Sequence, residues 1–152
     1  MSHQWLYLQN NIIIMWILYA LMAAFFAALT AIFAKMGVRN VNSDLATAIR
    51  SVVILVLTWG IVLIGGQIRG LRNIAGSTWI FLLLSGVATG LSWLFYFKAL
   101  QEGDVSKVAP LDKLSVVFTL ILAVVFLKEP VSPRVMMGTC LIVAGGVLMV
   151  TK

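Results

Sequence analysis

Five long apolar segments, separated by short polar connections, dominate the pattern of hydrophobic positions along the chain. A helix that crosses a bilayer needs about 20 apolar residues, and each segment comes close to that length. The connections at 35–44, 67–78, 101–104 and 128–132 leave no room for an extramembrane domain. The pattern therefore predicts one all-α domain over residues 1–152, with a polar N-terminal tail at 1–11. We expect a polytopic transmembrane helix bundle with spans at 12–34, 45–66, 79–100, 105–127 and 133–150.

Local signals predict where several spans begin and where one is irregular. Asp44 is expected to cap span two, and Ser132 followed by Pro133 is typical of the start of a helix. Pro110 lies within the first turns of span four, where its missing N–H would leave the carbonyl of Ser106 free. We therefore expect a kink or an irregular turn at that end of span four.

Composition supports a membrane protein and excludes several other classes. Hydrophobic residues make up 62% of the chain and charged residues only 11%, against about 25% charged in soluble domains. A soluble enzyme, a disordered segment and a disulfide scaffold are thereby excluded, and the single Cys140 has no internal partner. The net charge of +6 comes from scattered Lys and Arg, which favours anionic membrane lipid, not nucleic acid, as the partner.

The residue types that catalysis or metal binding would need are missing from the spans. There is no H-E-x-x-H motif and no Cys and His cluster, and the single histidine, His3, lies in the N-terminal tail. Asp112 is the only carboxylate within a predicted span. We therefore expect neither an enzyme nor a bound metal or cofactor.

Polar side chains recur at helical spacing in four of the spans. Residues three and four apart share a helix face, so each set forms a stripe. Stripes in spans one to four, with none in span five, favour a weakly polar cavity that span five braces. The alternative is that Ser and Thr hydroxyls bond their own helix carbonyls. The stripes are Trp16, Tyr19 and Thr30; Thr47, Ser51 and Thr58; Ser85, Thr89, Ser92 and Tyr96; and Asp112, Ser115 and Thr119.

Four charged residues approach one membrane side from within or near the ends of spans. Charges inside a span are costly and usually functional. Arg50 has two interpretations that can both hold, an ion pair with Asp112 or a contact with a substrate anion. Lys113 sits at a similar depth, whereas Lys98 lies near the end of its span and is interpreted as a snorkelling interfacial residue.

Small residues mark faces on which helices could pack closely. Gly86 and Gly90 form a GxxxG motif, for which packing within the chain is the simpler explanation. Span five carries Gly138, Gly145 and Gly146 and no polar stripe. Its glycines are therefore the better candidates for contact with a second subunit.

Several stretches resemble the EamA-type domain of the drug/metabolite transporter superfamily. These are residues 89–100, 108–117 and 126–130, together with Lys35 at the end of span one and Arg50 in span two. The resemblance covers nearly the whole chain. It implies movement of small metabolites by alternating access, with the single-unit members as the nearest parallel.

The resemblance and the residues together give a functional hypothesis. We expect a multi-pass plasma (inner) membrane transporter for a small polar metabolite. Span one lacks the acid that related multidrug exporters use, and the basic residues favour a zwitterionic or anionic substrate. The rival hypotheses are a lipid-linked sugar or phospholipid flippase and a non-transporting accessory protein. The expected binding residues are Arg50, Asp112, Lys113, Tyr19, Ser92, Trp93 and Tyr96.

One five-span unit is half of what alternating access between two repeats requires. A second unit would come from another copy, parallel or antiparallel, or from a paralogue. Basic residues in the connections set the orientation of a chain in the membrane, and here their number is equal on the two sides. Adding Arg50, Lys98 and Lys113 mildly favours a cytoplasmic C-terminus. One side has Arg69, Arg72, Lys128 and Arg134, and the other has Lys35, Arg39, Lys107 and Lys152.

Overall fold

The computed structural model describes the backbone of residues 2–151 and the side chains of residues 14–151. Over this range the chain forms helices and short connections. Five helical stretches of the described chain are long and apolar enough to cross a membrane, which confirms the all-α, five-span prediction. The elements are α1 (Ser2–Gly37), η1 (Val38–Asn40), α2 (Ser43–Ile64), η2 (Gln67–Asn73), α3 (Gly76–Glu102), α4 (Val105–Asp112), α5 (Ser115–Leu122), η3 (Ala123–Leu127) and α6 (Pro133–Val150).

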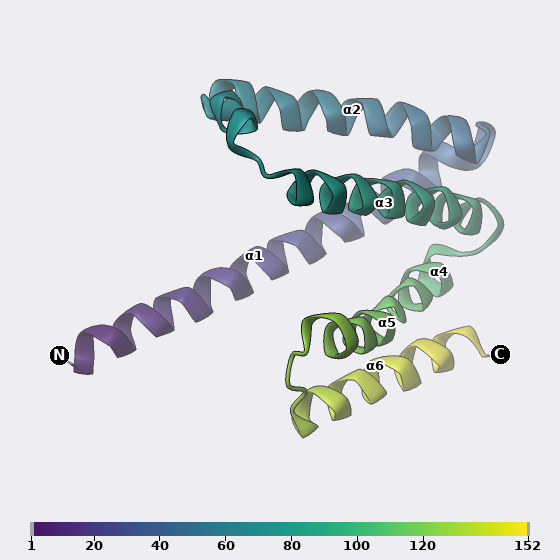
Figure 1. Cartoon of the computed structure of the whole chain (residues 1–152). Coiled ribbons are helices and arrows are strands. Elements are labelled where there is room, and N and C mark those ends of the chain that lie inside the picture. Colours follow the sequence, from purple (N-terminus) through teal and green to yellow (C-terminus); the bar gives the residue numbers. More distant parts are fainter. Residues whose placement is uncertain (1, 152) are drawn as a thin grey trace.

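The chain runs back and forth between two ends of the molecule (Figure 1). η1 and the turn between α3 and α4 lie at one end, here called the η1 end. η2 and the connection between α5 and α6 lie at the other, here called the η2 end. α2 packs beside α3, and α6 lies along α4. Because α3 also contacts α1 and α4, it is the central helix of the arrangement.

The start of α1 extends further toward the N-terminus than the apolar pattern indicates. Its backbone is helical from Ser2, so residues 2–11 continue the first helix instead of forming a separate tail. The side chains of residues 2–13, including His3, lie outside the described residues.

Helix caps set the starts of α2 and α6. The side chain of Asn42 accepts hydrogen bonds from the backbone N–H groups of Asp44, at 2.8 Å, and Leu45, at 3.3 Å. The expectation that Asp44 caps span two is therefore wrong, because the helix begins at Ser43 and Asn42 directly precedes it. Ser132 caps α6 with Pro133 in its first turn, as the sequence predicts.

Span four is broken near its start, as Pro110 predicts. α4 ends at Asp112 and α5 begins at Ser115. Across the break the hydrogen bonds shorten to three-residue steps, from Lys113 N–H to the Pro110 carbonyl and from Leu114 N–H to Leu111. A proline removes one N–H from the regular ladder and its ring clashes with the preceding turn. The result is a discontinuous helix, a feature that often lines binding sites in transport proteins.

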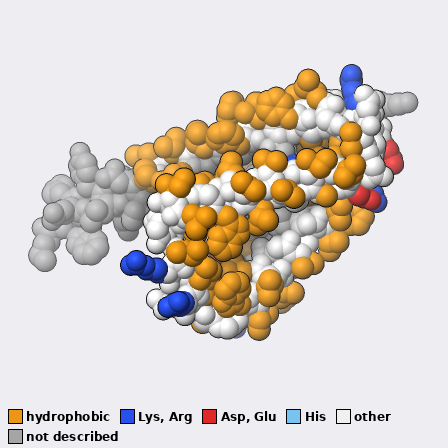
Figure 2. Space-filling view, turned by 90° about the horizontal axis from the view of Figure 1, so that it is seen from above, with side chains coloured by type: hydrophobic (Ala, Val, Ile, Leu, Met, Phe, Trp, Pro, Cys, Tyr) orange, Lys and Arg blue, Asp and Glu red, His pale blue; other side chains and the backbone are white. Residues whose placement is uncertain are grey.

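The buried core is small and lies at the η1 end. It consists of Ala34, Val38, Phe97 and Leu100, of which Val38 and Leu100 are almost wholly enclosed. Elsewhere the apolar side chains are largely exposed, and hydrophobic groups cover much of the face seen in Figure 2. In the most apolar window of each span, at most 11% of residues are buried. Lipid or another polypeptide must cover these surfaces, because water would not.

Candidate functional site

Arg50 of α2 stacks on Trp93 of α3. The guanidinium carbon lies 3.4 Å from the centroid of the indole ring and 5.7 Å from that of Phe97. Such cation–π contacts contribute about 0.5–2 kcal/mol, and more where water is excluded. Among the described side chains, Arg50 makes no hydrogen bond or ion pair, so its N–H donors remain available to a ligand.

Aromatic residues on one face of α3 form the wall that carries Arg50. Trp93 meets Tyr96 edge-to-face at 5.4 Å between ring centroids, and meets Phe97 at 5.9 Å. Residues three and four apart lie on the same face of a helix, which is why these rings touch. Because Phe97 is buried in the core at the η1 end, this wall is anchored to the best-packed part of the chain.

A groove of about 410 Å³ lies between α1 and α2, with Arg50 on its wall. Thr30 and Phe33 line it from α1, Ala46 and Ile49 from α2, and Phe97 from α3. The connection over residues 37–41 contributes further apolar lining at the η1 end. The groove thus combines a mostly apolar surface with one charged group, an arrangement typical of small-molecule sites.

A second cavity, of about 150 Å³, gathers five of the residues that the sequence predicts for binding. It lies between α1, α3 and the break in span four, and is lined by Ala27, Ser92, Trp93, Tyr96, Asp112 and Lys113. A neighbouring cavity of about 330 Å³ shares Ser92, Tyr96 and Asp112. Trp93 therefore borders the Asp112 cavity while its ring also supports Arg50.

Asp112 pairs with its neighbour Lys113 instead of Arg50. The Lys113 ammonium lies 3.2 Å from the Asp112 carboxylate. Within residues 14–151 no ion pair joins Asp112 to Arg50, so that part of the sequence interpretation is not realised. The reason is positional, because Arg50 turns onto the α3 aromatic wall while Asp112 sits in the cavity bordered by α1 and α3.

Several hydroxyls of the predicted stripes bond their own helix. Thr47, Ser51 and Thr89 each donate to the carbonyl four residues earlier at 2.8 Å. Thr58 does the same and borders a separate cavity at the η2 end. These hydroxyls follow the alternative explanation of the stripes, in which Ser and Thr satisfy their own backbone.

Other predicted lining residues are exposed on the single chain. In α1, Tyr19 lies about 12 Å along the helix axis from Ala27, which borders the Asp112 cavity. The structure therefore does not bring Tyr19 into that cluster. The residues of this exposed group are Trp16, Tyr19, Ser85, Ser115 and Thr119.

The glycines of α3 and α6 differ in what surrounds them. A Cβ on Gly146 would lie 3.4 Å from the Pro110 carbonyl oxygen, so this glycine packs against α4 of the same chain. Gly146 therefore serves helix packing within the chain, at the place where α6 approaches the break in span four. Nothing described lies within 4 Å of a Cβ on Gly86, Gly90, Gly138 or Gly145.

Sequence reasoning missed the contacts that hold α1 to the end of α3. The Lys35 ammonium donates to the carbonyl oxygens of Leu100, at 2.5 Å, and Gly103, at 2.7 Å. The Gln101 side chain donates to the carbonyls of Val38, at 3.4 Å, and Val41, at 3.2 Å. A cation at a helix C-terminus is favourable, but sequence alone does not indicate which helix end a lysine reaches.

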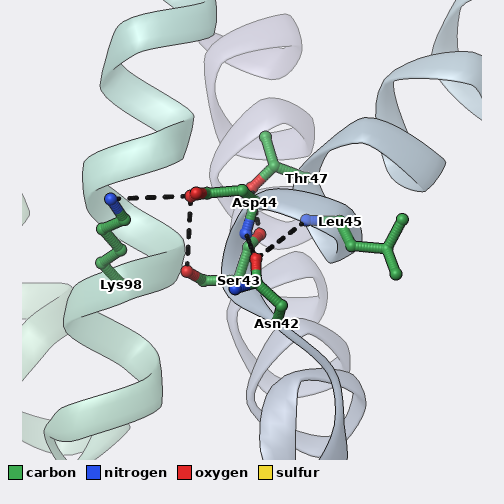
Figure 3. Close-up of polar contacts among 6 residues, drawn as sticks. All are labelled: Asn42, Ser43, Asp44, Leu45, Thr47 and Lys98. Carbon is green, nitrogen blue, oxygen red and sulfur yellow. Dashed lines mark hydrogen bonds and ion pairs between the residues drawn. The ribbon is translucent and has the colours of Figure 1, made fainter.

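A polar cluster joins the start of α2 to α3 at the η1 end (Figure 3). The Lys98 ammonium lies 3.6 Å from the Asp44 carboxylate. The Ser43 hydroxyl lies 3.5 Å from the same carboxylate. Lys98 and Asp44 are both more than half exposed, so the pair contributes about 0–1 kcal/mol. This ion pair and the hydrogen bonds of Lys35 and Gln101 hold the helices together at the η1 end.

Comparison with known proteins gives a family and one close relative. The model of the EamA-like transporter family matches residues 14–151. The chain is 52% identical over 134 residues to a Sinorhizobium sp protein named "Uncharacterized transporter in cobO 3′ region". That alignment covers 88% of this chain and 95% of the relative. No solved structure matches the chain.

Proposed function

The chain belongs to the EamA-like transporter family and is a multi-pass membrane transporter, and we propose that it moves a small polar, zwitterionic or anionic metabolite across the plasma (inner) membrane. The observation that carries this proposal is Arg50, held 3.4 Å over Trp93 with its N–H donors unused, beside a groove of about 410 Å³. A guanidinium positioned in this way can bind a carboxylate or phosphate with two parallel hydrogen bonds.

The cluster around Asp112 complements Arg50 in this proposal. Asp112 and Lys113 place a paired carboxylate and ammonium on the wall of a cavity that Trp93 and Tyr96 also line. Asp112 carries a proton or holds the second polar group of the substrate. The aromatic rings shape the apolar part of the site between the two charged regions.

Transport by alternating access requires a second five-span unit, and we propose a dimer. In transporters built from two repeats, the site lies where the repeats meet. The exposed apolar faces of this chain, including the unoccupied surfaces of Gly86, Gly90, Gly138 and Gly145, are suitable for packing against another helix. An antiparallel second copy would recreate an inverted repeat, whereas a parallel copy or a paralogue would use the same faces differently.

A lipid-linked sugar or phospholipid flippase is the second candidate, and one observation favours it. The groove is flanked by Phe33 and Ile49, which are both exposed, so this chain alone leaves it open along its side. A flippase needs such a lateral opening for a lipid tail. In proteoliposomes, translocation of labelled lipid without flux of any soluble metabolite would favour this candidate over the first.

The test of the proposed function is ligand-induced stabilisation of the purified protein across a panel of metabolites. We expect a stabilising ligand to lose its effect in Arg50→Ala, because the groove then has no cation, while the variant still inserts and folds. Arg39→Ala is the matched control, since Arg39 is an exposed cation at the same end of the molecule. Full stabilisation retained in Arg50→Ala would remove Arg50 from the site. If Arg50→Ala changed nothing and the unaltered protein also bound no ligand and carried no flux, an accessory protein would be indicated instead.

A further inference from the structure

We propose that the groove between α1 and α2 takes a soluble organic anion, with one acidic group on an apolar body, in preference to an amino-acid-like zwitterion. This inference rests on the proposed function and narrows its substrate class. The juxtaposition that carries it is a single free guanidinium on an otherwise uncharged groove of small-molecule size.

Arg50 is the one side chain lining the groove that can donate a hydrogen bond to an acidic group. The other lining residue with a polar side chain is Thr30, whose hydroxyl already donates to the Phe26 carbonyl at 2.8 Å. Trp93 covers one side of the Arg50 guanidinium without using any of its N–H donors. The groove is therefore built for one anionic group, which Arg50 can bind through two hydrogen bonds.

An ammonium group has no carboxylate to meet in this groove. None of the lining residues is acidic. At this end of the molecule, Asp44 is paired with Lys98, and Asp112 is paired with Lys113 in the other cavity. The Phe97 ring could attract a cation, but Arg50 already lies 5.7 Å from it and would repel a second positive charge. Moving an ammonium from water to this surface is therefore unfavourable.

The depth of Arg50 favours a soluble ligand over a membrane phospholipid. Arg50 follows Ser43, the first residue of α2, by seven positions, which places it about 10 Å along the helix axis. Lipid phosphates lie at headgroup level, near the ends of the spans. Val38 and Val41 of the connection line the groove between that level and Arg50 with apolar side chains, which offer nothing to a phosphate. The volume of about 410 Å³ falls within the range of small-ligand sites, about 300–1,000 Å³.

The experiment compares matched ligands on the full chain in nanodiscs of zwitterionic lipid. Butanoate, hexanoate, octanoate and 3-phenylpropanoate test the acid on a growing apolar body. Phenylalanine adds an ammonium to the last of these, and 3-phenylpropanamide removes its charge. We expect affinity to rise about fourfold per CH₂ from butanoate to hexanoate, the value for about 0.8 kcal/mol per buried CH₂. We expect phenylalanine and the amide to bind at least tenfold more weakly than 3-phenylpropanoate.

Variants assign the binding to this groove. Arg50→Gln should abolish carboxylate binding, and Ala46→Leu should block it by filling the groove while leaving Arg50 in place. Ala48→Leu is the matched control, because Ala48 lies on the same helix but does not line the groove. Unchanged carboxylate binding in Ala46→Leu would place the ligand elsewhere and overturn the proposal.

The remaining outcomes separate this inference from the proposed function. Phenylalanine binding as tightly as 3-phenylpropanoate, in an Arg50-dependent manner, would overturn the inference and leave the proposed function standing. Failure of all four carboxylates to bind would also overturn it, whatever other metabolites stabilise the protein. If phosphatidylglycerol in the nanodisc displaced the carboxylates competitively, the groove would be a lipid site and the proposal would be wrong.

Discussion

The ammonium of Lys35, at the end of α1, donates hydrogen bonds to the carbonyl oxygens of Leu100 and Gly103, at the end of α3. Two helices that run in the same direction are thereby joined where their chains turn. Because α1 lines the groove and α3 carries the aromatic wall under Arg50, this contact joins two of the helices that form the site.

Replacing Lys35 with Met should loosen the η1 end. The change keeps the apolar stem and removes the donor, which leaves the Leu100 and Gly103 carbonyls without this partner. We expect the free energy of unfolding in detergent to fall by about 1–3 kcal/mol. Arg39→Met is the control, since Arg39 is an exposed cation of η1. Equal stability of the two variants would contradict the role of Lys35.

Trp93 should act on ligand binding through Arg50. In Trp93→Leu the guanidinium loses the ring that supports it, at a cost of about 0.5–2 kcal/mol. We expect an anionic ligand to bind several-fold more weakly in Trp93→Leu, with Trp93→Phe intermediate because a smaller ring remains. The measurement is ligand affinity in each variant. A Phe variant as weak as the Leu variant would show that the ring face is not what matters.

Arg50 and Asp112 should behave as independent sites. Their charges belong to different contacts, one on Trp93 and the other on Lys113. A double-mutant cycle on the free energy of unfolding with Arg50→Ala and Asp112→Ala should therefore give a coupling below about 0.5 kcal/mol. The Arg50 and Trp93 cycle provides the comparison, for which we expect a larger coupling. A coupling above 1 kcal/mol between Arg50 and Asp112 would restore the ion-pair interpretation.

Gly146 and Gly145 should respond differently to a large side chain. Gly146→Leu places atoms against the Pro110 carbonyl and should destabilise the chain by about 1–3 kcal/mol through overpacking. Gly145→Leu has open space in the single chain, so it should leave the folded monomer intact. Cross-linking in membranes then tests whether Gly145 lies at the subunit contact. An unchanged dimer yield in Gly145→Leu would exclude that residue from the interface.

A reporter fused to the C-terminus should give signal on both sides of the membrane if two copies pair antiparallel. Basic residues in the connections are balanced between the two sides, so the positive-inside rule gives only a weak preference for either orientation in the membrane. A signal confined to one side would exclude the antiparallel homodimer and leave a parallel dimer or a paralogous partner.

The elements that local chemistry determines were predictable from the sequence. Long apolar runs indicate the five spans, and Pro110 indicates the break in span four because a missing N–H acts within its own helix. The Asp44 prediction failed by two residues, since Asn42, Ser43 and Asp44 are all good caps and only backbone geometry selects among them.

Contacts between helices were less predictable. Helical spacing groups Ser92 with Tyr96 on one face of α3, and the structure brings that face to Asp112 and Lys113. Spacing cannot show which neighbour a long side chain reaches, so Trp93 as the partner of Arg50 could not be predicted. For the same reason Tyr19, placed on a polar stripe by periodicity, lies on an exposed surface of the single chain.

The unequal lengths of α3 and α6 make the protein sensitive to bilayer thickness. α3 has 27 residues and α6 has 18, so they measure about 40 Å and 27 Å along their axes. A hydrocarbon core of about 30 Å is thicker than upright α6 can span and thinner than α3, which must tilt or protrude. Thinner membranes relieve the mismatch at α6 and increase the tilt that α3 must adopt. Lipid chain length thus alters the tilt of α3, the helix that carries Trp93.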